Sequence, residues 1–413
     1  MPTRRTFLQS GAFALTSLSQ AVQAATNSYQ RPKLKITDVR TAMVQVHGPQ
    51  AHIRIYTDQG FIGQGESTDA AVGTPALIQS FSRFLIGRDP LNIDAIWDSI
   101  RKSGIFAGAQ GGQYTTALSG LEIALWDLAG KALNLPVYQL MGGKFRDRIR
   151  MYCDSDMTDV LGAEGDRKLA WIQEAGFTAT KMDIDDARDP ARFDRVNRTA
   201  SNGEIDRMVR EVSHIREKLP RNIDLAVDMH GFYDAPTGKR VAQEMEPFHL
   251  LWLEEPVPAE NVEAMADIRR STKTPICCGE NLFMRFGYTE LLEKHAVDII
   301  MPDIQKTGGL SESRKIANLA EAYYIPFAPH CVVSPVGTMA SAHVCASVPN
   351  FLVCEWHWIN HTDLWKSWVK EGEIIEKGFI TVPDRPGIGV EMNDEVAKKA
   401  QMRGTTWFAP NAG

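Results

Sequence analysis

The sequence predicts an α/β protein: a TIM-like (β/α)7-8 barrel with an N-terminal α+β capping domain that the C-terminal segment completes. The first observation is that Asp228, Glu254 and Glu280 each close a short apolar run, and 26 residues separate each from the next. This spacing is close to one strand-plus-helix unit in a barrel of about 250 residues. The second is that a chain of 413 residues with 44% apolar residues can fill such a core and carry a further domain.

The third observation is that Asp303, His330 and Glu355 continue the pattern, each at the end of another apolar run. Any one of these residues could cap a helix or form a loop ion pair. Their regular recurrence instead favours one barrel mouth, because the C-terminal ends of parallel strands share a face and catalytic groups come from several strand ends.

The chain divides into four parts by composition and periodicity. Alternating apolar and polar residues predict antiparallel strands near the N-terminus, and apolar residues at helical spacing follow over 74–140. Loops around 44–52 and 65–74 are placed to close on a ligand at the barrel mouth. The predicted parts are a signal peptide over 1–24, a capping domain over 33–147, a barrel over 148–362 and a segment over 363–413 that returns to the cap.

The N-terminus has the features of an export signal. Arg4 and Arg5 precede an uncharged apolar stretch that ends in a small-residue cleavage site near Ala24. The paired arginines predict twin-arginine export and a periplasmic location. No apolar run approaches the length of about 20 residues that a membrane span needs, so we expect no membrane association of the mature form.

The net charge and the cysteine spacing argue against two kinds of site, a nucleic-acid interface and a cysteine zinc site. The net charge is −6, with no basic face for a phosphate backbone, so nucleic acid is not an expected partner. The cysteines show no paired zinc spacing, and those on predicted strands are interpreted as small buried packing residues. These are Cys153, Cys277, Cys278 and Cys354.

The three carboxylates at the strand ends predict a metal site. Asp228, Glu254 and Glu280 would form an oxygen-rich cage, and Mg²⁺ is the expected ion because it prefers carboxylate and water to nitrogen or sulfur. Lys181 and Asp183 lie two residues apart on the preceding predicted strand, so both face the mouth. Lys181 there would act as an electrostatic clamp on a carboxylate-bearing ligand.

Longer motifs give the chain a family resemblance. The segment "ALSGLEIALWDLAGKALNLPVYQLMGGKFRDRIRMY", the segment "MPDIQKTGGLSES", the His of "APHC" and the carboxylate triad resemble the mandelate racemase/muconate lactonizing enzyme family of the enolase superfamily. The resemblance implies that the triad binds Mg²⁺, that Asp303 orients His330, and that Glu355 hydrogen-bonds the substrate carboxylate or the developing enolate. It also implies a homo-oligomer, either a dimer or an octamer.

Two departures from the racemase pattern point to one branch of the family. Many members carry Lys-x-Lys on the second strand, whereas this chain has Lys181-Met182-Asp183, so a second-strand lysine base is absent. His230 stands where racemases have Asn, which is similar to the galactonate dehydratase branch. That branch dehydrates acid sugars to 2-keto-3-deoxy acids. The resemblance therefore implies a small-molecule carboxylate, an acid sugar, as substrate.

The residues suit that chemistry. A His with a pKa of about 6.5 can remove a proton near neutral pH, which makes His330 the expected base, and Lys181 and Glu355 would stabilise the developing charge. His230, two residues after Asp228, is the expected acid for the departing hydroxyl. A hydrogen bond that only fixes Asp228 is the alternative for His230.

Five further residues are expected near the substrate: Asp183, Arg285, His357, Trp356 and His47. Core packing is an equal alternative for Trp356 and a subunit contact for Arg285. The rest of the acidic loop 183–189 is expected to be a solvated surface. Two other functions remain open: an epimerase, racemase or lactone cycloisomerase that uses the same enolate, and a non-catalytic exported binding protein.

Overall fold

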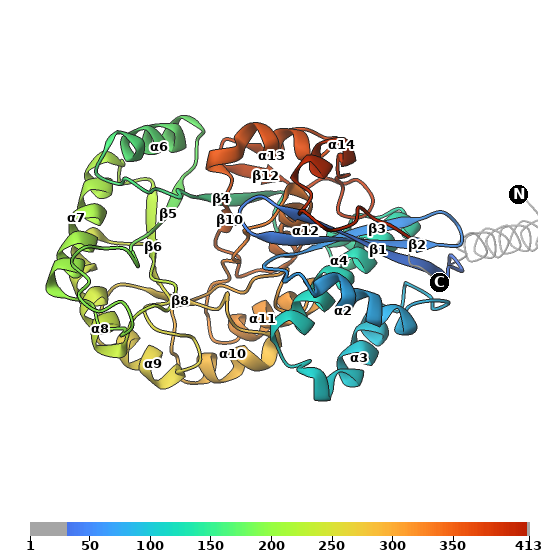
Figure 1. Ribbon diagram of the computed structural model, residues 1–413, viewed down its shortest axis with the longest axis horizontal. Coiled ribbons are helices and arrows are strands. Elements are labelled where there is room, and N and C mark those ends of the chain that lie inside the picture. Colours follow the sequence, from blue (N-terminus) through green and yellow to red (C-terminus); the bar gives the residue numbers. More distant parts are fainter. Residues whose placement is uncertain (1–30, 411–413) are drawn as a thin grey trace, which may run out of the picture.

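The computed structural model describes residues 31–410, so the predicted signal peptide lies outside the described residues. Figure 1 shows a barrel surrounded by helices α6 to α11 on one side of the molecule. The N-terminal strands and the first helices form a second body beside it, and the C-terminal segment lies against both. This arrangement is the predicted barrel with its capping domain.

The cap begins with a three-stranded antiparallel sheet in the order β1-β2-β3. Its strands are β1 (Ile36–Gln45), β2 (Pro49–Thr57) and β3 (Ile62–Ser67). The sheet packs against helix α4 at very short range. A Cβ atom added to Gly65 would lie 2.1 Å from the carbonyl oxygen of Gly120, so both positions require glycine for the strand and the helix to touch.

Helices complete the cap and confirm the helical spacing over 74–140. α4 is buried along most of its length because it lies between the cap sheet and the barrel helices. The helices are α2 (Thr74–Ser80), η1 (Phe81–Phe84), α3 (Ile93–Ser103), η2 (Ile105–Ala107), α4 (Gly112–Leu133) and α5 (Val137–Leu140).

The barrel is a parallel sheet closed on itself. Its strands are β4 (Arg148–Asp154), β5 (Ala179–Asp183), β6 (Asp224–Asp228), β7 (Leu253–Glu254), β8 (Ile276–Cys278), β9 (Ile299–Ile300) and β10 (Cys354–Trp356). Consecutive strands from β4 to β9 pair in parallel, and β10 pairs with β4. Between β9 and β10 the chain has an irregular segment whose Phe327 bridges Ile300 on one side and Phe351 on the other. This segment occupies the seventh strand position and closes the ring.

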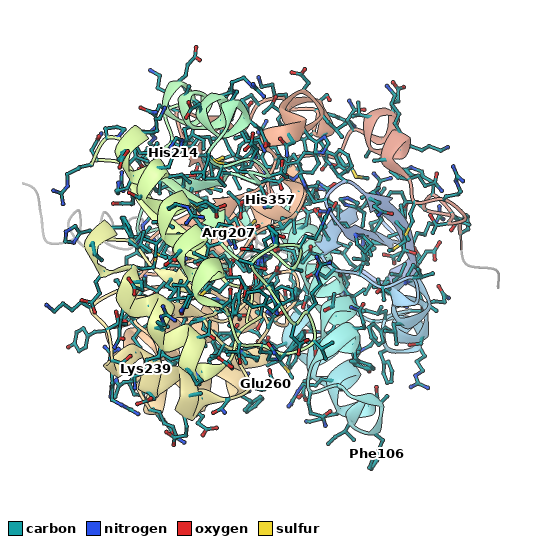
Figure 2. All side chains as sticks on the ribbon, turned by 60° about the vertical axis from the view of Figure 1, so that its left-hand side comes forward. Phe106, Arg207, His214, Lys239, Glu260 and His357 are labelled. Carbon is teal, nitrogen blue, oxygen red and sulfur yellow. The ribbon has the colours of Figure 1, made fainter. Side chains whose placement is uncertain are left out.

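A ring of helices covers the outside of the barrel. These are α6 (Ala163–Glu174), α7 (Asn202–Lys218), α8 (Ala235–Glu244), η3 (Glu246–Phe248), α9 (Val262–Arg270), α10 (Met284–Glu293), α11 (Leu310–Glu321) and α12 (Pro335–Ser347). α7 starts at a capping box in which Ser201 and Glu204 satisfy each other's backbone N–H groups. Figure 2 shows Arg207, His214 and Lys239 on this outer layer, whereas Phe106 lies at the far end of the cap.

The C-terminal segment joins the barrel to the cap. It contains η4 (Ile359–His361), α13 (Thr362–Trp368), β11 (Ile375–Glu376), β12 (Phe379–Thr381), α14 (Asp394–Ala397) and η5 (Lys398–Ala400). β12 pairs antiparallel with the start of β4. Farther on, Trp407 forms a bridge with Ala42 in the cap strand β1, and Gln401 forms one with Val44. The predicted return of this segment to the cap is confirmed.

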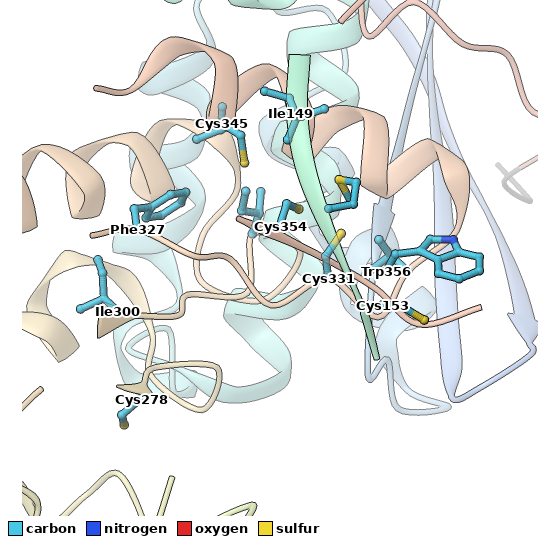
Figure 3. Packing of buried hydrophobic residues seen from close by; sticks show 14 of the residues in the cluster. Ile149, Cys153, Cys278, Ile300, Phe327, Cys331, Cys345, Cys354 and Trp356 are labelled. Carbon is cyan, nitrogen blue, oxygen red and sulfur yellow. The ribbon is translucent and has the colours of Figure 1, made fainter. Parts of the chain in front are cut away.

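The cysteines behave as packing residues. All six are buried free thiols, and Figure 3 shows Cys153, Cys331 and Cys354 among other buried apolar side chains. Buried free cysteines usually act as small apolar packing residues, which agrees with the interpretation from the sequence. Within residues 31–410, no helix combines the length and the apolarity that a membrane span requires.

Candidate active site

Four charged side chains meet at the carboxyl ends of the barrel strands. The Nζ atom of Lys181 lies 3.1 Å from Asp228 Oδ2, 3.3 Å from Glu254 Oε2 and 3.0 Å from Glu355 Oε1. The strand register explains the meeting, since Asp183 of β5 pairs with Asp228 of β6, which pairs with Glu254 of β7. All four side chains are at most 2% exposed, so the cluster is shielded from bulk water.

Negative charge exceeds positive charge in this cluster. Asp154 at the end of β4 lies 3.6 Å from the same Lys181 ammonium, and Asp183 and Glu280 lie at neighbouring strand ends. Burial and the neighbouring Asp154 and Asp228 carboxylates raise the pKa of Asp183 to about 8. Uncompensated buried carboxylates are unfavourable, and a bound cation is the usual compensation.

Two of the predicted metal ligands, Asp228 and Glu254, offer buried carboxylate oxygens beside Lys181. Oε1 of Glu254 is buried and has no hydrogen-bond partner, which leaves one oxygen free for a ligand. Burial and the Asp228 carboxylate raise the pKa of Glu254 well above its usual range. The close grouping of possible metal ligands at this place contains Asp183, Asp228 and His230, with one ligand atom of each within 4.8 Å of the others. Oxygen-rich donor sets of this kind hold hard divalent cations.

His330 and Asp303 form the expected dyad. The Nδ1 atom of His330 lies 2.6 Å from Asp303 Oδ2, and the backbone N–H of Gln305 donates a 2.8 Å hydrogen bond to the other Asp303 oxygen. Nε2 of His330 therefore faces the mouth, 3.0 Å from Glu280 Oε2 and 3.6 Å from Glu355 Oε2. Burial lowers the pKa of His330, but the Glu355, Glu280 and Asp303 carboxylates together raise it well above its usual value.

His230 follows β6 in a strained backbone conformation. Its φ is 46°, in the left-handed region that non-glycine residues rarely adopt, and its backbone N–H donates a 2.8 Å hydrogen bond to Asp228 Oδ1. The ring Nδ1 lies 2.9 Å from Asp185 Oδ1, whereas Nε2 lies 3.8 Å from Asp228 Oδ2. Burial lowers the pKa of His230, but Asp185 and Asp228 raise it to about 11. The hydrogen bond that fixes Asp228 therefore comes from the backbone of His230 and not from its imidazole. The imidazole contacts Asp185 through Nδ1, and its Nε2 atom is available to a ligand.

Two more histidines line the cap side of the mouth. The His357 Nδ1 atom lies 3.4 Å from Asp154 Oδ2, and the His47 ring from the β1–β2 turn lies 4.8 Å from the His357 ring. Burial lowers the pKa of His357, but Asp154 raises it to about 9. Burial and the neighbouring His357 lower the pKa of His47 to about 3. The cap loop that carries His47 thus reaches the barrel residues that follow β10.

Two expectations need correction, one for Trp356 and one for the acidic loop after β5. Trp356 points away from the mouth, because side chains alternate along a strand and the inward direction at β10 belongs to Glu355. The Trp356 indole instead stacks on Trp171 and Phe177, with ring centroids 5.7 and 5.3 Å away. Arg285 forms an ion pair with the buried Glu312 at the start of α11.

The acidic loop 183–189 is also not simply a solvated surface. Asp185 contacts His230, and Asp189 is buried against Arg207 of α7. Sequence reasoning therefore missed Asp154 and Asp185 as site residues. Asp154 closes the apolar run "IRMYC" just as the other carboxylates close theirs, so its signal was present. Asp185 had no comparable signal, because loop geometry brings it to His230.

A closed parallel barrel, an acid–base dyad at its mouth and a cap over that mouth define an enzyme of the barrel class. Residues 25–142 match the "Mandelate racemase / muconate lactonizing enzyme, N-terminal domain", and residues 166–396 match "Enolase C-terminal domain-like". The chain belongs to the mandelate racemase/muconate lactonizing enzyme family of the enolase superfamily.

Two related proteins and one related crystal structure match nearly the whole chain. A D-xylonate dehydratase of Haloferax volcanii is 40% identical over 91% of this chain and 90% of that protein. A D-galactonate dehydratase of Xanthomonas campestris is 33% identical over 87% of this chain and 92% of its own length. A mandelate racemase/muconate lactonizing enzyme-like protein from Rubrobacter xylanophilus superimposes with a TM-score of 0.87 at 42% identity, covering 92% of this chain and all of its own.

Proposed function

We propose that this protein is a Mg²⁺-dependent acid sugar dehydratase that acts on aldonic or aldaric acids. The observation that carries the proposal is a pair of histidines at one barrel mouth, each with Nδ1 against its own carboxylate. Those pairs are His330 with Asp303 and His230 with Asp185. Removal of a proton and departure of a hydroxyl need one base and one acid, and this mouth offers both. The D-xylonate and D-galactonate dehydratases among the relatives support the same reaction and substrate class.

Asp228, Glu254 and Glu280 would hold the Mg²⁺. When bound there, the ion would supply Lewis-acid stabilisation of negative charge on the substrate carboxylate. The Lys181 ammonium, already among the same carboxylates, adds a second positive charge at this place. Glu355 lies between Lys181 and His330 and completes the wall of the site.

His330 removes the proton next to the substrate carboxylate. Because its Nδ1–H donates to Asp303, the lone pair that accepts the proton is on Nε2, the atom that faces the mouth. The electron pair of the broken C–H bond moves toward the carboxylate and forms an enolate. Asp303 then stabilises the imidazolium, as a buried carboxylate does for a catalytic histidine.

His230 supplies the proton for the departing group. Its Nε2 atom donates to the β-hydroxyl, the C–O bond breaks, and the oxygen leaves as water while the enolate electron pair forms a C–C double bond. The resulting enol takes up a proton at C3, loses the proton of its C2 hydroxyl, and becomes a 2-keto-3-deoxy acid. His230 must carry a proton on Nε2 when this step begins, as a general acid does.

Asp183 of β5 and two cap-side histidines are assigned to the distal hydroxyl groups of the substrate. Asp183, His47 and His357 offer hydrogen-bonding atoms there, and Oδ1 of Asp183 and Nε2 of His47 are buried without a partner. Buried polar atoms of this kind give a site its selectivity, because a substrate without the matching hydroxyl leaves them unpaired.

Product analysis tests the proposal directly. The purified protein with Mg²⁺ is incubated with a panel of aldonic and aldaric acids that includes D-xylonate and D-galactonate, and the product is trapped with semicarbazide. We expect a 2-keto acid, with a mass lower by one water, from at least one acid. Isomerised substrate of unchanged mass would identify an epimerase, and a lactone would identify a cycloisomerase.

We further propose that the protein is exported by the twin-arginine route and forms a homo-oligomer. The first part rests on Arg4, Arg5 and the apolar stretch that follows. Replacement of both arginines by lysine should retain the full-length protein in the cytoplasmic fraction. The oligomer is supported by the family resemblance, and light scattering of the purified protein measures it.

A further inference from the structure

Asp185 is the residue that connects the acidic loop after β5 to the site. Its Oδ1 atom lies 2.9 Å from Nδ1 of His230, and its side chain is only 11% exposed. The loop leaves β5 in a fixed direction because the backbone N–H of Ile184 donates a 3.0 Å hydrogen bond to the carbonyl oxygen of Asp228. Asp185 is thus held beside the strand end that carries His230.

The backbone of His230 is held from a different side. Its N–H donates to Asp228 Oδ1 at 2.8 Å, and both His230 and the next residue, Gly231, have positive φ angles of 46° and 63°. A strained turn of this kind persists only where the surrounding structure requires it. It fixes the position of the His230 Cα, but rotation about the side-chain bonds would still leave the ring free to turn.

We propose that Asp185 is the positioning residue for His230, holding the ring so that Nδ1–H donates to the carboxylate and Nε2 faces the reacting groups. The inference rests on the proposed function, in which His230 donates the proton that removes the hydroxyl. After that donation from Nε2, the neutral ring keeps its Nδ1–H and its hydrogen bond to Asp185. The orientation is therefore maintained through the whole step.

The geometry resembles the other dyad at the same mouth. Asp303 contacts Nδ1 of His330 at 2.6 Å and leaves Nε2 toward the mouth, and Asp185 does the same for His230 at 2.9 Å. A histidine with one nitrogen bound to a carboxylate has a defined tautomer and a defined ring direction. The chain therefore has a separate orienting carboxylate for each half of the reaction, and only one of them was visible in the sequence.

The test separates proton removal from water loss. The variants Asp185→Asn, Asp185→Ala and His230→Asn are incubated with Mg²⁺ and the accepted acid sugar in D₂O, and NMR measures both deuterium at the α-carbon of recovered substrate and product formed. Asp186→Asn is the matched control, since it removes the same charge from an exposed neighbour in the same loop. Thermal unfolding of each variant checks that it folds.

We expect Asp185→Asn to slow dehydration by about ten- to a hundred-fold, the usual effect of removing an orienting partner, and Asp185→Ala to slow it at least as much. The ratio of deuterium incorporated in recovered substrate to product formed should rise, as for His230→Asn. The reason is that the enolate is reprotonated to substrate when its hydroxyl group cannot leave. Wild-type turnover of both Asp185 variants, with His230→Asn impaired, would overturn the positioning role and leave the proposed function standing. A parallel loss of exchange and dehydration would also overturn it. Normal turnover of His230→Asn would instead overturn the general-acid assignment on which the inference rests.

Discussion

The imidazole of His330 lies among three carboxylates, and its contacts define its role. Asp303 occupies Nδ1, so Nε2 is the atom available to a substrate proton. Glu280 and Glu355 lie 3.0 and 3.6 Å from Nε2. A base held in this way acts in one direction only, which is what selective removal of a single proton requires.

Replacement of this base should stop the reaction at its first step. We expect His330→Asn to lower both α-proton exchange and dehydration by about 10²- to 10⁴-fold, the contribution that general base catalysis usually makes. NMR in D₂O measures both rates. The exposed His295 provides the matched control, and His295→Asn should behave as wild type. Exchange at the wild-type rate in His330→Asn would show that another group removes the proton.

Substitution of Glu254 tests whether this carboxylate is a ligand of the cation. Chelation of divalent cations should abolish activity and lower the midpoint of thermal unfolding, and Mg²⁺ should restore both. Binding at a hundred times the dissociation constant stabilises a protein by about 2.7 kcal/mol. Glu254→Gln removes one buried donor charge and should lose most of the Mg²⁺-dependent shift, whereas the exposed Glu260→Gln should keep it. An undiminished shift in Glu254→Gln would exclude this carboxylate as a ligand.

The sequence predicted those site residues that lie at regular strand ends. Asp228, Glu254 and Glu280 follow one spacing, and the pattern extends to His330. Asp185 and Arg285 were not predictable in this way. Their positions depend on loop geometry and on an ion pair with Glu312, and neither leaves a periodic signal.

At the scale of elements, buried carboxylates of the cap bind the N-termini of barrel helices. Glu66 of β3 accepts hydrogen bonds from the backbone N–H groups of Ser334 and Gly337 at the start of α12, at 2.8 and 3.0 Å. Glu122 of α4 accepts from the backbone N–H of Leu310 at the start of α11, at 2.8 Å. Unpaired N–H groups and the helix dipole both favour an anion there.

Loss of the charge on Glu66 should weaken the contact between the cap and helix α12 and so lower the stability of the protein. We expect Glu66→Gln to reduce the free energy of unfolding by about 1–3 kcal/mol, because the amide NH₂ group would face buried donors that then lack an acceptor. Urea denaturation measures the change. The exposed Glu321→Gln at the end of α11 should be neutral, and an equal loss in both variants would contradict the assignment.

Most helices and strands could be predicted from the periodicity of their apolar residues. The cap strands and the helical spacing over 74–140 are present as predicted. The barrel strands are short, and β7 and β9 contain only two residues each, so their order came from the spacing of the polar residues that end them. The irregular seventh position around Phe327 could not be distinguished from a regular strand, because both are apolar runs.

At the scale of the whole molecule, one buried histidine joins cap, barrel and C-terminal segment. His343 of α12 accepts a 3.1 Å hydrogen bond at Nδ1 from the backbone N–H of Tyr138, and its Nε2–H donates at 3.0 Å to the carbonyl oxygen of Ile388. The contact at Nδ1 requires the neutral ring, because a protonated nitrogen cannot accept a hydrogen bond. Burial lowers the pKa of His343 to about 4.

This histidine makes stability depend on pH in a defined direction. In the unfolded chain the ring takes up a proton near pH 6.5, but in the folded protein only near pH 4, so the unfolded state is favoured as the pH falls between these values. The loss is on the order of 3 kcal/mol. Denaturation of the wild type and of His343→Gln at pH 7.5, 5.5 and about 4.5 should show a difference in stability that shrinks with falling pH. A constant difference would contradict the assignment.

Proton NMR of the protein with Mg²⁺ and acid sugars in D₂O, with and without a chelator, distinguishes a dehydratase from the other enzymes of this family. We expect one acid to lose its α-proton and to be converted to a 2-keto-3-deoxy acid, and we expect the chelator to stop this conversion. Deuterium exchange at the α-carbon with no loss of water, for every acid in the panel, would contradict a dehydratase. In that case His330 would remove the α-proton, but His230 would not assist the loss of the hydroxyl group.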